Sequence, residues 1–165
     1  MREKRSNYSL MAKVFHWGFI VLFGYGLIKA VEDLDQLDDY FFLRFEVLFA
    51  LAFLLLLIAR FVYMKKTQET SLPENTSSIQ KLIARIVHMG MYVTLAVIAS
   101  TGLIIGLLFQ LGLENSFLIK TVIAIHEFGI PVMYWLIGFH VLAAVYHRLL
   151  GDGVWSSMVP FWKED

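Results

Sequence analysis

Residues 117–150 read FLIKTVIAIHEFGIPVMYWLIGFHVLAAVYHRLL, an almost unbroken apolar run that carries three histidines. A helix crosses a bilayer core with about 20 apolar residues, so this run is long enough to span a membrane. Its histidines are His126, His140 and His147. A side chain that can ionise or bind a metal is costly at membrane depth and therefore indicates a functional site.

Three further apolar runs precede this one, and together they predict membrane spans over 14–31, 40–64, 79–109 and 117–150. The chain is 58% hydrophobic, above the ~45–50% of soluble domains. We predict an all-α fold, an integral-membrane four-helix bundle forming one domain over 1–165. The basic N-terminus could belong to a signal peptide, but its apolar run is long and we expect the segment to be retained. Ser77 and Gln80 fit a capping box, which predicts that the third helix begins there.

The distribution of lysine and arginine predicts the orientation in the membrane. Eleven cations lie in the two terminal segments and the second loop or at the helix ends beside them, and three lie at the opposite ends: Lys29, Arg44 and Lys120. Short cytoplasmic segments carry the excess of positive charge, so both termini are expected in the cytoplasm. The first loop is then external, and it is acidic through Glu32, Asp33, Asp35, Asp38 and Asp39. Its field suits a basic protein as a partner and would repel a small anion.

Three histidines are expected at one depth near the cytoplasmic side. His16 and His88 each lie three residues after a basic residue at the start of a span, and His140 lies two turns before the end of the fourth. His126 precedes His140 by fourteen residues, about 21 Å of helical rise and nearly four whole turns. The two side chains therefore point in almost the same direction at two depths, as two stacked haems would require.

Imidazoles that project from different helices into a bundle core are typical haem ligands. The chain has no cysteine, which excludes covalent haem attachment through a Cys-x-x-Cys-His motif and thiolate metal sites. The pattern therefore predicts a b-type cytochrome with His16 and His140 as iron ligands, the alternative being a hydrogen-bonded pair that joins two helices. His88 could be a ligand, a propionate partner or part of a quinone pocket. Arg60 and Arg85 could hold propionates, or could simply follow the positive-inside rule.

Several motifs resemble the bacterial cytochrome b561 family, which is similar to the cytochrome b subunits of membrane hydrogenases. They span the whole chain: Phe15-His16-Trp17, Leu57–Arg60, Ala84–Tyr92, Ile125-His126-Glu127, and His140 followed seven residues later by His147-Arg148. The resemblance implies a four-helix bundle in the bacterial cytoplasmic membrane that carries haem b. It also implies that His16 and His140 are the axial pair of a cytoplasmic-side haem and that His126 belongs to an outer haem.

The resemblance places the second ligand of the outer haem fourteen residues before Arg60, where this chain has Glu46. A carboxylate is a poor partner for a bis-imidazole site. Three outcomes remain, in order of preference: no outer haem, a five-coordinate haem on His126, or an unusual site formed by His126 and Glu46. One haem is therefore expected, and a second is in doubt.

The expected function is one-electron transfer through haem b, with ubiquinone or menaquinone as the small-molecule partner that the resemblance implies. One alternative is a haem-bearing membrane-anchor subunit of a larger oxidoreductase. Two less favoured alternatives are a superoxide:quinone oxidoreductase and a haem-free membrane protein. The expected surroundings are the lipid bilayer, and nothing in the sequence indicates a nucleic-acid partner.

Overall fold

The computed structural model describes residues 7–29 and 34–164, and within them every regular element is a helix. The elements are α1 (Leu10–Ile28), η1 (Leu34–Asp38, a 3-10 turn), α2 (Tyr40–Thr67), α3 (Ser78–Gln110), α4 (Phe117–Leu150) and α5 (Val154–Met158). The four long helices are long and apolar enough to cross a membrane. The predicted all-α membrane fold is therefore confirmed.

The four long helices begin where side-chain caps satisfy the first free backbone N–H groups. Ser9 caps α1 by accepting a bond from the N–H of Ala12, so this helix begins four residues before the predicted span. Its last residue is Ile28, three residues before the predicted end, and residues 30–33 lie outside the described part of the chain. The capping box of Ser77 and Gln80 is confirmed at the start of α3.

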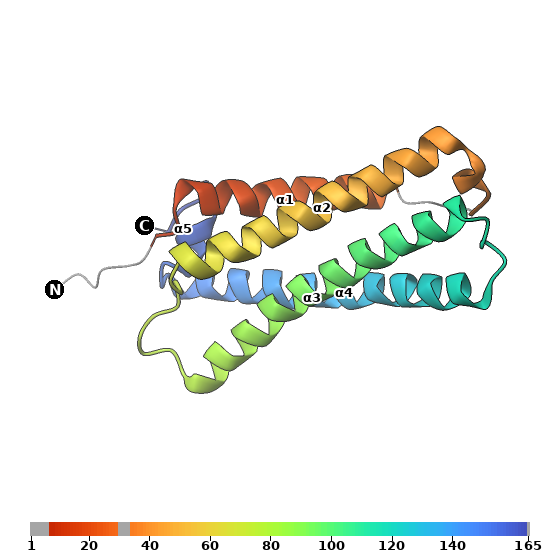
Figure 1. The fold of residues 1–165 in the computed structure, drawn as a ribbon. Helices are drawn as coiled ribbons and strands as arrows, with labels where there is room; N and C mark the ends of the chain where they lie inside the picture. The colour runs from red at the N-terminus through yellow and green to blue at the C-terminus, as the bar shows by residue number, and fades with distance from the viewer. Residues whose placement is uncertain (1–6, 30–33, 165) are drawn as a thin grey trace.

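Figure 1 shows α1 and α2 side by side and α3 crossing α4, with both termini and the connection from α2 to α3 at one end of the bundle. This end is called the terminal end below, and the other the outer end. Of the described residues, no Cα atom of α1 lies within 8 Å of one in α3 or α4, whereas α1 does approach α2 and α5. Side chains alone therefore bridge from α1 to α4. Which end faces the cytoplasm stays a prediction.

The core lies mainly between α2, α3 and α4. Phe19 from α1 joins it near the middle of the bundle, packed against Phe53 with ring centres 5.2 Å apart. Toward the outer end α2 and α3 are in close contact. A Cβ added to Gly106 of α3 would overlap the side chain of Val47 of α2. The outer half is thus closely packed, whereas the end of α2 and the start of α3 diverge at the terminal end (Figure 1).

Candidate functional site

Three histidines from three helices meet in one layer near the terminal end. The ring centres of His16 on α1 and His140 on α4 are 6.1 Å apart, with their planes at 61°. The rings of His88 on α3 and His140 are closer, at 5.0 Å and 78°. The sequence predicted that these three residues share one depth, and the structure brings them together. This set is called the histidine layer below.

Arg60 supplies a positive charge inside this layer. Its Nη2 lies 3.2 Å from Nδ1 of His16, and its guanidinium stands over the rings of Phe19 and Tyr92 at 5.3 and 5.5 Å. Its Nε is buried and has no hydrogen-bond partner. Arginine only donates hydrogen bonds, so His16 accepts through Nδ1. Arg60 is half-buried, has a free donor and makes no ion pair with a carboxylate among the described residues, so it is suited to an anionic group from outside the chain.

His88 has a different hydrogen bond. Its Nδ1 lies 2.6 Å from the carbonyl oxygen of Ala84, one turn earlier on α3. Since a carbonyl only accepts, Nδ1 carries the proton and Nε2 keeps its lone pair. His88 lies seven residues, or two turns, before the buried Leu95, so it belongs to the interior face of α3. It is nevertheless exposed.

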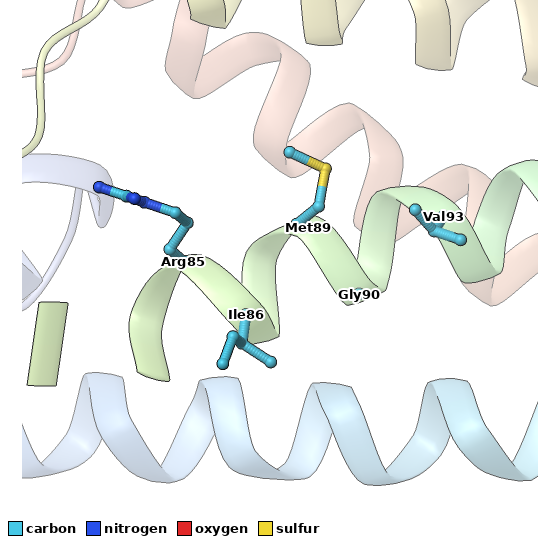
Figure 2. Close-up of a pocket in the computed structure, with 5 residues that line it drawn as sticks. All are labelled: Arg85, Ile86, Met89, Gly90 and Val93. Carbon is cyan, nitrogen blue, oxygen red and sulfur yellow. The ribbon is translucent and has the colours of Figure 1, made fainter. Parts of the chain in front are cut away.

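Arg85 is exposed and lies outside the histidine layer. It lines a shallow groove of about 430 Å³ along α3. The other lining residues are Ile86, Met89, Gly90 and Val93, which are all apolar (Figure 2). The predicted role of Arg85 as a propionate partner therefore stays a prediction, and its observed place is at one end of an apolar groove.

His126 lies in the outer half, bonded to α3. Its Nδ1 is 3.0 Å from Oγ1 of the buried Thr101, which itself donates to the carbonyl oxygen of Val97 at 2.7 Å. The hydroxyl therefore accepts from the His126 Nδ1–H. Glu46 is half-buried on α2 and makes no hydrogen bond or ion pair with any described residue. The structure does not join His126 and Glu46 by a hydrogen bond, and the predicted site at these two residues stays a prediction.

The C-terminal segment covers the terminal end of the bundle, a contact that sequence reasoning missed. Trp17, which directly follows His16, donates from Nε1 to the carbonyl oxygen of Met158 at 3.3 Å, and its ring lies 5.2 Å from that of Phe161. The C-terminal segment, with α5, thus packs against α1. No pattern in the sequence signals this contact.

The other residue that sequence reasoning missed is Thr101. The sequence does contain a signal for it, because Thr101 is a polar residue within an apolar span, close to the interior face of α3. A threonine inside a membrane helix commonly bonds back to its own helix, however, so the residue type alone gives no reason to expect a histidine partner.

Two residues of the acidic loop, Glu32 and Asp33, lie outside the described part of the chain. The backbone of Asp35 belongs to η1. Asp38 and Asp39 are exposed at the outer end, and Asp39 also caps α2 by accepting bonds from the N–H groups of Phe41 and Phe42. Asp38 and Glu114 together line a depression at this end. The described part of the outer end also carries three cations, Lys29, Arg44 and Lys120, so its acidic character rests on the loop between α1 and α2.

The histidine layer can hold a metal that takes two protein nitrogens. Over residues 7–29 and 34–164, no three histidine or carboxylate side chains are grouped to enclose a metal ion. Two imidazoles on opposite sides of one metal have ring centres roughly 6 Å apart, given metal–nitrogen bonds of about 2 Å. The distance from His16 to His140 fits this requirement, and the free Nε of Arg60 fits an acidic substituent on the same group.

Comparison with known proteins gives one family. The family described as prokaryotic cytochrome b561 matches residues 7–161, nearly the whole chain. No curated protein and no solved structure matches the chain significantly.

Proposed function

Since this chain belongs to the prokaryotic cytochrome b561 family, and is thus a multi-pass bacterial membrane protein of the b-type cytochromes that take part in electron transfer, we propose that His16 and His140 hold its haem iron. The distance of 6.1 Å between their ring centres is the observation that carries this assignment. Bound haem supplies an iron that exchanges one electron at a time. The ligands, their hydrogen bonds and their burial set its potential.

Holding the iron requires a change of partner at His16. Ligation through Nε2 needs the tautomer with the proton on Nδ1, and a ligating histidine normally donates that proton to an acceptor. In the structure, Nδ1 of His16 instead accepts a hydrogen bond from Arg60. The guanidinium of Arg60 must therefore leave His16, and a propionate is the acceptor that its free donors would take.

Two features of the outer half favour one haem per chain over two. His126 is bonded to Thr101, and the Cβ of Ala50 and the ring of His126 both lie within 4 Å of where a Cβ on Gly102 would be. With Glu46 in place of a second imidazole, the outer region has one candidate ligand and close helix packing. We assign Glu46 no iron bond.

Quinone is the proposed small-molecule partner, in keeping with the family resemblance. The apolar groove beside Arg85 lies along the first half of α3, and an apolar ring and tail would suit its lining (Figure 2). The proposed orientation puts both termini in the cytoplasm and the outer end, with its acidic first loop, outside. That end suits a basic redox protein, which would be drawn in by charge.

The proposal is tested by measuring the number of haem groups per polypeptide in the detergent-purified protein. Haem is quantified as pyridine haemochrome and compared with the protein mass. We expect a ratio near one and a low-spin spectrum. His140→Ala should abolish the low-spin spectrum. His147→Ala is the matched control on the same helix and should leave it unchanged, because the Nδ1 of His147 is bonded to Asp152 at 2.6 Å, two turns from His140.

Each other outcome has a defined meaning. A colourless wild-type protein would refute the cytochrome assignment for this chain, and a ratio near two would refute the single site. If a second polypeptide purifies stoichiometrically with the haem protein, the chain is instead the membrane-anchor subunit of a larger oxidoreductase.

A further inference from the structure

The imidazole nearest to His140 belongs to His88, not to His16. The two ring centres are 5.0 Å apart with planes at 78°, against 6.1 Å for His16. His140 thus has an imidazole neighbour on α1 and another on α3. Only one of them can lie opposite His140 on a single iron.

The hydrogen bonds of the two candidates differ in a way that matters for ligation. His88 donates from Nδ1 to the carbonyl oxygen of Ala84 at 2.6 Å, which leaves a lone pair on Nε2. Backbone carbonyls are usual partners for the second nitrogen of a ligating histidine, since they fix the tautomer and the ring orientation. His16 accepts from Arg60 instead, so its Nε2 carries the proton until Arg60 leaves. In this structure His88 therefore has the tautomer that ligation through Nε2 requires, whereas His16 does not.

An iron between His88 and His140 requires a small change in the observed geometry. Their ring centres would have to move apart from 5.0 Å to roughly 6 Å, the spacing expected for two imidazoles on one metal. His88 is exposed although it lies on the interior face of α3, and the start of α3 diverges from the end of α2 (Figure 1). The exposed side of the His88 ring gives it space to move by about 1 Å.

We propose that His88 is a second axial ligand for the haem, able to replace His16 opposite His140. The inference rests on the proposed haem site in the histidine layer. It gives the iron two alternative imidazole pairs that share His140, one completed from α1 and the other from α3. His16 is the ligand when Arg60 no longer donates a hydrogen bond to it. His88 is the ligand when that hydrogen bond is present.

The test is the spin state of the haem in single and double variants, read from the optical and electron paramagnetic resonance spectra of the purified proteins. In His16→Ala we expect a low-spin, six-coordinate spectrum with a shifted midpoint potential. In His16→Ala/His88→Ala the haem should become high-spin and five-coordinate. The matched double variant His16→Ala/His147→Ala should stay low-spin, because the pair formed by His88 and His140 is intact.

The proposal is overturned if His16→Ala is already high-spin, or if it folds but holds no haem. If the alanine variant fails to fold, His16→Gln replaces it, since the glutamine side-chain oxygen can accept a hydrogen bond from Arg60. The same spectra are expected for this variant, and the same results count against the proposal. His140→Ala separates this failure from failure of the haem site itself. If that variant keeps the wild-type spectrum, the site is wrong, whereas a lost low-spin spectrum there together with a high-spin His16→Ala refutes His88 alone.

Discussion

Replacing Gly129 by alanine tests how closely α3 and α4 approach each other. Gly129 is buried on α4, and a Cβ added to it would lie 2.8 Å from Cγ1 and 3.3 Å from Cδ1 of Ile98. Carbon atoms pack at about 3.5–4.0 Å, so Ile98 or the two helices would have to move by roughly 0.7 Å or more. Cγ1 is the first atom of its branch and follows the helix backbone, so turning the end of the side chain gives little relief.

The expected net effect is a loss of about 1–2 kcal/mol in the free energy of unfolding. Adding a methyl group to a filled core costs about 1–3 kcal/mol, and replacing glycine by alanine inside a helix returns up to about 1 kcal/mol. The assay is unfolding of the purified protein in mild detergent by added denaturing detergent, followed by far-ultraviolet circular dichroism. Ile98→Ala should relieve the clash, so in that background Gly129→Ala should cost less by about 1–3 kcal/mol.

Gly138→Ala is the matched control, because Gly138 lies on the same helix and a Cβ added to it would meet no atom within 4 Å. It should gain up to about 1 kcal/mol from helix propensity alone. The close approach of α3 and α4 is refuted if Gly129→Ala stabilises the protein as much as Gly138→Ala does. It is also refuted if the cost of Gly129→Ala is the same with and without the Ile98 side chain.

Three further predictions concern the outer site, a helix cap and the C-terminal segment. Glu46→His should leave the haem ratio near one, because α2 and α3 already touch in the outer half; a ratio near two would contradict this close packing. Ser77→Ala removes the bond to the N–H of Gln80 and should lower the free energy of unfolding by about 1 kcal/mol, so an unchanged unfolding curve would count against the cap. Trp17→Phe removes the bond to Met158 and should speed limited proteolysis after residue 158 at constant helix content, and equal cleavage rates would show that the contact does not hold the segment.

The helices could be predicted from the sequence because hydrophobic length alone separates four spans, and because Ser77 and Gln80 form a local capping pattern. The shared depth of His16, His88 and His140 could also be predicted, since depth follows from the distance along a helix to its end. That prediction needed no knowledge of how the helices are turned about their axes.

The partners of these residues could not be predicted, because they depend on helix rotation and on contacts between distant segments. The bond from Arg60 to His16 joins residues 44 positions apart, and the bond between Thr101 and His126 joins residues 25 apart. Arginine near the end of α2 also fits the positive-inside rule, which hides its contact with a histidine. The contact of the C-terminal segment is equally non-local, since Trp17 and Met158 lie 141 positions apart.

The way α1 is attached has a consequence for the supply of the protein in the cell. Among the described residues, the backbone of α1 approaches only α2 and α5, and the His16 side chain contacts His140 on α4. A molecule that binds the folded chain at a concentration 1,000 times its dissociation constant adds about 4 kcal/mol of stability, and a cofactor between His16 and His140 would apply that gain at the least firmly held helix. Chains made while the cofactor is scarce would expose α1 to membrane proteases, so the abundance of the protein would follow the cofactor supply without any separate control of its synthesis.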